Sequence, residues 1–221
     1  MDLGIKGRKA IVCAASKGLG KGCAMALARE GVDVVISART AETLNATADE
    51  IRSETGVTVT AVPGDVTTEA GRAALLEACP APDILINNAG GPPPGDFRDF
   101  DMEDWRKAVE GNMITPLALI KSTVYDMMDR GFGRIINITS FSVKAPIAAL
   151  ELSNGARAGL TGAVAVLARK SAAKNVTING MLPGPFDTDL LRGTSIKMAE
   201  DEGITFDEAH KKRMQVVPAK R

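Results

Sequence analysis

Six short runs of apolar, mostly β-branched residues recur along the chain and are separated by longer stretches with helical spacing of apolar positions. In the segment 19–30, for example, Leu19, Cys23, Ala26 and Leu27 fall on one face, which predicts an amphipathic helix. Each apolar run predicts a buried strand. The six predicted strands are residues 10–13, 32–37, 57–62, 84–87, 134–138 and 176–182.

Strands that alternate with helices predict a parallel sheet. The runs 84–86 and 135–136 are continuously apolar, as is typical of strands covered on both faces. We therefore expect an α/β fold, a single Rossmann-type doubly wound parallel sheet flanked by helices. No internal repeat, low-complexity tract or domain boundary interrupts residues 1–221, so we expect one domain.

Composition narrows the class of protein. The 27 basic residues equal the 27 acidic ones, and 45% of residues are hydrophobic, so nothing favours a nucleic acid or a membrane as partner. No window approaches the length of a membrane-spanning helix and residues 1–9 lack an apolar core, so we expect a cytoplasmic protein. Cys13, Cys23 and Cys79 are odd in number and widely spaced, which favours reduced thiols and no metal site.

A glycine-containing loop joins the first predicted strand to the first helix. There, backbone amides and a helix N-terminus can receive a pyrophosphate. The alternative is a plain tight turn, but the strand before it and the helix after it favour nucleotide binding. The loop residues that we expect to contact the cofactor are Ala14, Ser16, Lys17, Gly18, Leu19 and Gly20.

The end of the second strand indicates which dinucleotide binds. A protein that binds a ribose 2'-hydroxyl carries an acidic residue here, whereas this chain has Arg39, whose guanidinium suits a 2'-phosphate. Lys17 adds a second positive charge. Two solvated surface cations are the alternative, but the pair favours NADP(H) over NAD(H).

Five further motifs follow in order along the chain. They are Asp65-Val66 after the third strand, Asn87-Asn88-Ala89-Gly90 after the fourth, Asn112, Ser140 after the fifth, and Pro183-Gly184 with Thr188. In order and spacing they resemble the short-chain dehydrogenase/reductase family over residues 3–191. The resemblance implies that Asp65 and Val66 contact adenine and that Asn88, Ala89 and Gly90 line the cofactor. It also implies that Asn112 organises a proton-relay water, Ser140 binds the substrate carbonyl, and Pro183, Gly184 and Thr188 hold the nicotinamide end.

The chain departs from the family at its proton donor. The family has Tyr-x-x-x-Lys about 13 residues after the serine, but this chain has Ser153 and Arg157 at those places. A serine hydroxyl is a far weaker acid than that tyrosine, and an arginine stays protonated, although Arg157 can still bind ribose hydroxyls. The only tyrosine, Tyr125, precedes Ser140, and we interpret it as a helix-packing residue. The loop also has Cys13-Ala14 where the family usually has Thr-Gly.

Other groups are alternatives for the missing acid. Lys144 and Glu151 flank the site in sequence, but charged loop residues are usually solvated. His210 is the only imidazole and lies in a polar helical segment. We favour a relay through Ser140, Asn112 and an ordered water.

Small residues gather on the predicted helix 153–174. Glycine inside a helix costs up to about 1 kcal/mol relative to alanine, so close packing is expected to compensate. That packing would be against the domain's own sheet or against a copy of the helix in another subunit. The small residues are Gly155, Ala156, Gly159, Gly162 and Ala163. In the family, this helix and the segment 105–129 form a dimer interface, so we expect a homodimer or homotetramer.

Two functions from different classes fit these observations. The first is an NADP(H)-dependent oxidoreductase that reduces a small-molecule ketone or oxidises a secondary alcohol, resembling the 3-oxoacyl-carrier-protein reductases but with an atypical proton donor. The second is a catalytically weak NADP(H)-binding protein that acts as a sensor or interaction partner. The missing tyrosine supports the second, and the otherwise complete site supports the first.

The C-terminal end of the sequence leads to one more expectation. The family continues through another helix and a final strand that would pair beside 176–182, and neither is seen in this sequence. We expect either an incomplete copy of a longer chain or a short protein whose exposed strand edge is covered by a neighbouring subunit.

Overall fold

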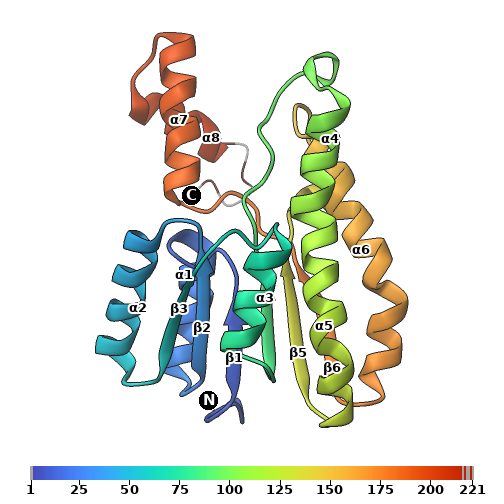
Figure 1. Cartoon of the computed structure of the whole chain (residues 1–221). Coiled ribbons are helices and arrows are strands. Elements are labelled where there is room, and N and C mark those ends of the chain that lie inside the picture. The colour runs from blue at the N-terminus through green and yellow to red at the C-terminus, as the bar shows by residue number, and fades with distance from the viewer. Residues whose placement is uncertain (1, 216, 218–219, 221) are drawn as a thin grey trace. The chain divides into compact units, whose positions relative to one another are not determined.

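The computed structural model describes residues 2–215, 217 and 220 and contains a six-stranded parallel sheet with helices on both faces (Figure 1). The strand order is β3-β2-β1-β4-β5-β6. The strands are β1 (Lys9–Val12), β2 (Asp33–Ala38), β3 (Val59–Pro63), β4 (Ile84–Asn87), β5 (Gly133–Ile138) and β6 (Val176–Met181). The helices are α1 (Gly18–Arg29), α2 (Ala41–Thr55), α3 (Glu69–Ala78), α4 (Met102–Val109), α5 (Thr115–Asp129), α6 (Glu151–Ala172), α7 (Asp189–Glu202) and α8 (Phe206–Gln215).

The six predicted strands and the Rossmann-type fold are confirmed. Neighbouring strands are parallel because each return passes through a crossover segment. Both faces of the sheet are covered, which explains the continuous apolar runs. Val12 belongs to a cluster with α1 and α2 on one face, and its neighbour Ile11 belongs to a cluster with α3, α5 and α6 on the other. Among the described strands, β6 lies at one edge and pairs with β5 alone.

The buried face of helix α1 differs from the predicted one. Ala26 is exposed, whereas Ala24 and Ala28 are buried against the sheet. Leu19 and Cys23 are only half-buried beside the same cluster. The buried face is therefore rotated from the predicted one toward the smaller side chains, because these let the helix approach the strands closely.

Two predictions about helix packing are also corrected. Tyr125 on α5 is 60% exposed, so it is not a packing residue within this chain. The glycines of α6 face another helical segment of the same chain: a Cβ on Gly155 would lie 3.3 Å from Trp105, and one on Gly159 would lie 2.8 Å from Met113 Sδ. Gly162 has no atom within 4 Å of such a Cβ. The close approach therefore involves Gly155 and Gly159 and does not extend to Gly162.

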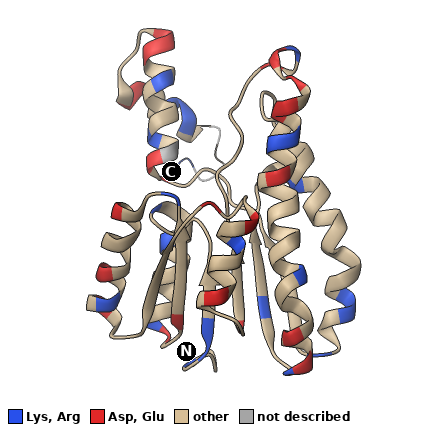
Figure 2. Ribbon diagram, viewed as in Figure 1, with Lys and Arg blue, Asp and Glu red and all other residues tan. Residues whose placement is uncertain are grey.

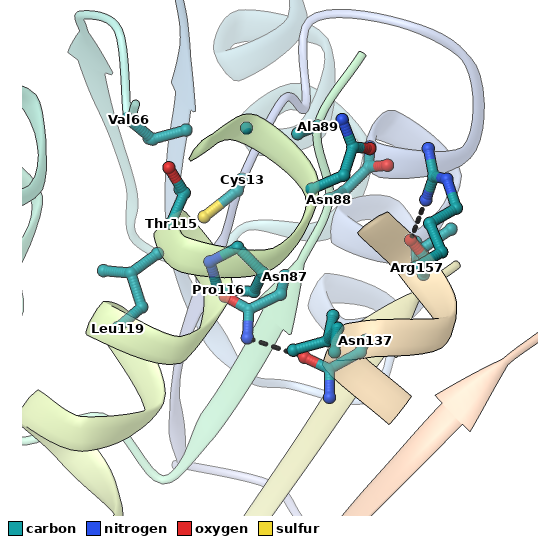
Figure 3. Close-up of a pocket in the computed structure, with 14 residues that line it drawn as sticks. Cys13, Val66, Asn87, Asn88, Ala89, Thr115, Pro116, Leu119, Asn137 and Arg157 are labelled. Carbon is teal, nitrogen blue, oxygen red and sulfur yellow. Dashed lines mark hydrogen bonds between the residues drawn. The ribbon is translucent and has the colours of Figure 1, made fainter. Parts of the chain in front are cut away.

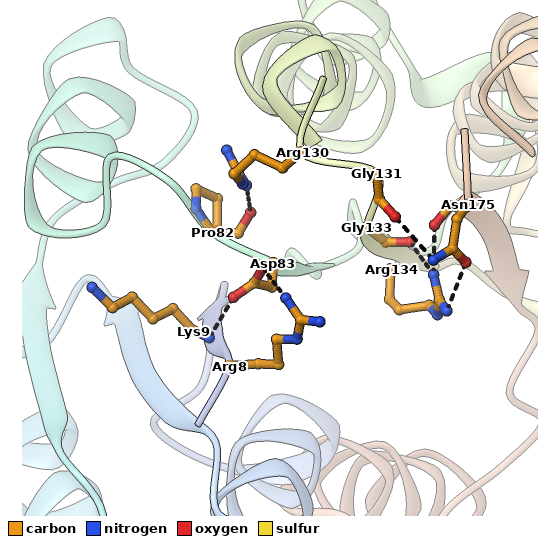
Figure 4. A network of polar contacts seen from close by, with 9 residues as sticks. All are labelled: Arg8, Lys9, Pro82, Asp83, Arg130, Gly131, Gly133, Arg134 and Asn175. Carbon is orange, nitrogen blue, oxygen red and sulfur yellow. Dashed lines mark hydrogen bonds and ion pairs between the residues drawn. The ribbon is translucent and has the colours of Figure 1, made fainter. Parts of the chain in front are cut away.

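A polar network holds the amino-terminal ends of the strands together (Figure 4). The Asp83 carboxylate accepts hydrogen bonds from Arg8 Nη1 at 3.1 Å and from the Lys9 amide at 3.0 Å. Arg134 Nη1 donates to the carbonyl of Asn175 at 2.8 Å. These contacts connect β1, β4, β5 and β6 at the end of the sheet away from the glycine loop. Elsewhere, charges of both signs are distributed over the helices, while the strands carry few (Figure 2).

The chain divides into two compact units, Met1–Leu182 and Pro183–Arg221. In the second unit, Arg192 forms a two-bond ion pair with Asp187, at 2.7 and 2.8 Å. His210 stacks on Phe206 with ring centroids 5.6 Å apart. No helix in the described part of the chain is long and apolar enough to cross a membrane.

Candidate functional site

The glycine loop after β1 is a tight backbone turn. Ala14 adopts φ 49°, a left-handed conformation that is unusual for a residue with a Cβ. Gly20 lies so close to this turn that a Cβ on it would be 2.2 Å from the Ala14 carbonyl oxygen. The same carbonyl accepts a hydrogen bond from Asn88 Nδ2 at 3.3 Å, which ties the loop to the segment after β4. The structure thus brings Ala14, Gly20 and Asn88 together, as the sequence predicts.

Helix α1 begins directly after this turn. Lys17 is its N-cap residue, its side chain makes no capping bond to the amides of the first turn, and that turn contains no acidic residue. Gly18 has φ 57° and starts the helix. The Ser16 carbonyl is held by the Thr47 hydroxyl at 2.9 Å. An uncapped helix N-terminus with a lysine beside it is a favourable place for a phosphate group.

Arg39 and Asp65 lie near one another at the ends of β2 and β3. The carboxylate of Asp65 accepts from the Thr67 amide at 2.9 Å and from the Thr67 hydroxyl at 2.8 Å. These bonds, the amide first, hold the pKa of Asp65 below its usual value, and the charge of Arg39 lowers it further. Arg39 itself is exposed, so its guanidinium is available to a ligand.

A small cavity lies between the ends of β4 and β5 and the segment before α5 (Figure 3). Its volume is about 20 Å³, which is enough for one water molecule. Of the residues that line it, three have a buried side-chain oxygen with no hydrogen-bond partner among the described residues: Asn87 Oδ1, Asn112 Oδ1 and Thr115 Oγ1. Val66, Asn88 and Ala89 also line the cavity.

Asn112, which lines this cavity, lies where the helix geometry changes locally. Residues Glu110–Ile114 form a π-helical turn between α4 and α5. Such turns displace the backbone and occur frequently at functional sites. Asn112 is buried, and its Nδ2 donates to the Gly90 carbonyl at 3.3 Å. Asn112 and Gly90 are therefore in direct contact.

Ser140 follows β5 and caps a short 3-10 turn, Phe141–Val143. Its Oγ accepts a hydrogen bond from the Ser142 amide at 3.2 Å. Because the oxygen is used as an acceptor, the hydroxyl proton remains available for donation to another group.

Ser153 and Arg157 lie one turn apart on α6 and are in direct contact. Arg157 Nε donates to Ser153 Oγ at 3.1 Å. Arg157 Nη1 donates to the carbonyls of Ile138 and Thr139, at 3.0 and 3.1 Å. Thr139 immediately precedes Ser140, so the guanidinium is fixed beside that serine's backbone. Burial lowers the pKa of Arg157 from its ordinary value, but an arginine remains charged at neutral pH.

The alternative acids lie in different surroundings. Lys144 is exposed. Glu151 Oε1 accepts from the Ala149 amide at 3.3 Å, and Glu151 Oε2 is buried without a partner among the described residues. His210 belongs to the second unit, where its Nδ1 is buried and also lacks such a partner.

The predicted nicotinamide segment also belongs to the second unit. Thr188 is the N-cap of α7, and its hydroxyl oxygen accepts from the Leu191 amide at 3.4 Å. Pro183 and Gly184 precede it and begin that unit. Their contact with a cofactor remains a prediction.

Two residues that line the cavity, Asn137 and Thr115, were missed by the sequence analysis. Asn137 on β5 accepts from Asn87 Nδ2 at 2.8 Å, and both line the cavity together with Thr115. A polar residue in each of two neighbouring apolar strands was the available signal. Within the described residues, no group of three or more His, Cys, Asp or Glu side chains is arranged to hold a metal ion.

The order of the strands, the glycine turn after β1 and the polar residues at the ends of β4 and β5 define a Rossmann-type α/β protein. The chain belongs to the short chain dehydrogenase family, whose model matches residues 8–199. This match confirms the family that the sequence motifs indicated.

Three comparisons show the range of similar proteins. The chain is 30% identical over 224 residues to a 7alpha-hydroxysteroid dehydrogenase of Escherichia coli (strain K12), covering 100% of this chain and 83% of that one. It is 28% identical over 195 residues to the 3-oxoacyl-[acyl-carrier-protein] reductase of Aquifex aeolicus (strain VF5), covering 86% and 78%. The structure superposes with a TM-score of 0.94 on L-sorbose reductase from Gluconobacter frateurii complexed with NADPH and L-sorbose, at 28% identity over 100% of this chain and 86% of that one.

Proposed function

We propose that the protein is an NADP(H)-dependent oxidoreductase that reduces a ketone or oxidises a secondary alcohol. The observation that carries the proposal is the gathering of Ser140, Asn112 and Arg157 around the ends of β4 and β5, at the same edge of the sheet as the glycine loop. In open α/β sheets, ligands bind at this carboxyl edge. The similar L-sorbose reductase binds NADPH and a small carbonyl compound, which supports the assignment.

The residues present fit a phosphorylated dinucleotide. Gly20 leaves space beside the Ala14 carbonyl that a side chain would fill, and the uncapped start of α1 offers amide donors to a pyrophosphate. Arg39 is exposed beside Asp65 and can bind a 2'-phosphate, while Asp65 and Val66 would contact adenine. Arg157, with donors left on Nη2, would bind the ribose of the nicotinamide half. In the second unit, Pro183, Gly184 and Thr188 would contact the nicotinamide.

Ser140 is the residue that we assign to the substrate carbonyl. When bound, NADPH supplies the hydride for the carbonyl carbon. Since Ser140 Oγ already accepts from the Ser142 amide, its hydroxyl can donate to the carbonyl oxygen and stabilise the negative charge that develops there. Arg157 adds a fixed positive charge next to the same stretch of β5.

The proton reaches the product oxygen by an atypical route in this proposal. Ser153 and Arg157 take the places of the family's tyrosine and lysine, and neither is a good acid at neutral pH. We assign the proton to a relay in which the Ser140 hydroxyl passes its proton to the product oxygen and takes one from a water molecule organised by Asn112, so that no serine alkoxide is left. The polar cavity beside Asn112 has room for such a water.

Single-turnover kinetics tests this function. Enzyme with bound NADPH is mixed with a panel of ketones, and loss of NADPH absorbance is followed. We expect oxidation with at least one ketone, and a decrease of about 100-fold in the rate for Ser140→Ala, since one donor to the developing oxyanion is lost. Tight NADPH binding without oxidation by any ketone would instead identify a binding protein that acts as a sensor or interaction partner.

The assembly and the compartment complete the proposal. We propose a homodimer or homotetramer formed through α6 and the α4–α5 segment, in the cytoplasm. Exposed Tyr125 on α5 and Val166 on α6, at 60% and 64%, support a contact on these helices. Sedimentation that shows a monomer would refute the assembly.

A further inference from the structure

Arg157 carries a buried charge that the protein does not neutralise. Its exposure is only 9%, and none of the ion pairs of the described residues includes it. Its three bonded acceptors, the Ser153 hydroxyl and the carbonyls of Ile138 and Thr139, are all neutral. Buried charges in proteins are normally paired. The neighbouring carboxylate on α6, Glu151, is two residues before Ser153 and so on the opposite side of the helix.

The guanidinium also keeps donors for a ligand. Nε and Nη1 are used, whereas Nη2 has no hydrogen-bond partner among the described residues. Nη2 points toward the loop that follows β4, since a Cβ on Gly91 would lie 3.6 Å from it. Nη2 carries two hydrogens, so one can bind a ribose hydroxyl and the other a second oxygen.

The position of Nη2 on the guanidinium shows where a ligand oxygen bound to it would lie. Nε and Nη2 form one edge of the planar guanidinium, so an oxygen bound by Nη2 on that edge lies next to the Ser153 hydroxyl. The other side of the guanidinium contacts Thr139, the residue before Ser140. The guanidinium is thus hydrogen-bonded to the residue that precedes Ser140, so a ligand on Nη2 and a carbonyl on Ser140 would lie at the same end of β5.

We propose that the substrate is an oxo acid, in which a carboxylate one or two carbons from the reacting carbonyl binds Arg157 Nη2 beside Ser153. This inference rests on the proposed function, because it assigns the substrate class of the same site. A carboxylate supplies the negative charge that the buried guanidinium lacks, and it is small and planar enough to share the edge with Ser153. A neutral ester or amide of the same acid supplies no such charge.

The test compares matched substrates. Acetoacetate, methyl acetoacetate and acetoacetamide, together with pyruvate and methyl pyruvate, are assayed with NADPH. We expect kcat/KM for the acids to exceed that of their esters and amide by at least about tenfold, as for other charge-assisted contacts to arginine. Equal values for acid and ester would overturn the inference and leave the proposed function intact.

Variants assign the preference to Arg157. Arg157→Gln should reduce the ratio of acid to ester to near unity, and Arg157→Lys, which keeps the charge, should restore part of it. Arg169→Gln makes the same change at an exposed position of α6 and should leave the ratio unchanged. Because each ratio is measured within one variant, a general loss of activity does not imitate the effect. A ratio that survives in Arg157→Gln would overturn the inference.

A binding measurement separates this inference from the proposed function. The enzyme–NADPH complex is titrated with acetoacetate and with its methyl ester, and cofactor fluorescence is followed. If no ketone is reduced, the proposed function fails, but a dissociation constant at least about tenfold lower for the acid would still support the carboxylate site. Equal affinities, or no binding of the acid, would overturn it. Circular dichroism and thermal melting show whether each variant is folded.

Discussion

Arg157 Nε donates to Ser153 Oγ over 3.1 Å within α6, and this contact joins the two residues at which the chain departs from Tyr-x-x-x-Lys. The bond gives Ser153 a structural role, because it satisfies a donor of a buried guanidinium. It also fixes the guanidinium against β5, next to Ser140.

Ser153→Ala should therefore affect stability more than catalysis. The free energy of unfolding should fall by about 1–3 kcal/mol, since a buried charged donor loses its acceptor. Turnover should fall by less than about tenfold, because the serine is not the proposed proton donor. Urea unfolding and steady-state kinetics measure the two effects. Ser122→Ala makes the same change at an exposed position of α5 and should change stability by less than about 0.5 kcal/mol. A loss of turnover by several orders of magnitude would show that Ser153 transfers the proton.

Arg39→Asp should reverse the choice of cofactor. The unaltered protein is expected to bind NADPH more tightly than NADH by about 2 kcal/mol, or roughly 30-fold, because the exposed guanidinium of Arg39 binds the 2'-phosphate. With aspartate at this place, the 2'-phosphate is repelled and a 2'-hydroxyl is accepted. Fluorescence titration with both cofactors measures the order. Arg169→Asp, on α6, is the control and should leave the order as it is. Equal affinities in the unaltered protein would contradict the assignment.

Gly20→Ala should disrupt the nucleotide loop, whereas Gly22→Ala should not. A Cβ on Gly20 would lie 2.2 Å from the Ala14 oxygen, so the backbone of the loop must move. We expect a loss of about 1–3 kcal/mol in stability and weaker NADPH binding. A Cβ on Gly22, in the same helix, meets no atom within 4 Å. That change should stabilise the protein by up to about 1 kcal/mol. Thermal melting and cofactor titration measure both, and similar behaviour of the two variants would refute the close approach.

Ala14→Gly should stabilise the protein. Ala14 has φ 49°, and the left-handed conformation costs an ordinary residue about 1–2 kcal/mol. Part of this is offset by the greater freedom of glycine in the unfolded chain, so we expect a gain of about 0.5–1 kcal/mol, which raises Tm by a few degrees. Ala15→Gly is the matched control: Ala15 is fully buried and not left-handed, and its replacement should lower Tm. A lower Tm for Ala14→Gly would show that the loop relaxes differently.

Cys13 should make stability depend on alkaline pH. Burial raises the pKa of its thiol to about 12, and this outweighs the effect of the nearby polar groups of Ser37 and Asn88, which lower the pKa. In the unfolded chain the thiol has a pKa of about 8.5. The folded state therefore holds the proton more tightly, so its contribution to stability is complete below about pH 8.5 and is lost as the pH rises toward 12.

The comparison with Cys13→Ala isolates this effect. Urea unfolding of both proteins should give free energies whose difference is constant near neutral pH. Above about pH 9 the unaltered protein should lose stability faster than the variant. Parallel loss in both proteins would mean that other groups cause the alkaline dependence.

The strands, their parallel arrangement and the glycine loop could all be predicted from the amino-acid sequence. Val12 and Ile11 show why: successive side chains of a strand point to opposite faces of the sheet, so a run of apolar residues without alternation indicates that both faces are covered. The turn after β1 is likewise local, since its shape depends on residues that are neighbours in the chain. The contact of Ser153 with Arg157 follows the four-residue spacing of a helix and was also within reach of the sequence.

Contacts between segments that are far apart in the chain could not be predicted and are seen in the folded protein alone. Gly155 and Gly159 could pack on the sheet or on another subunit as far as their pattern shows, but Trp105 and Met113 occupy that face. The bonds from Arg157 to the end of β5 depend on how α6 lies against a strand from an earlier part of the chain. The π-turn at Asn112 is also invisible in the pattern of apolar positions. Periodicity is a property of neighbours along the chain, whereas the neutral partners of Arg157, and with them its uncompensated charge, depend on packing between distant segments.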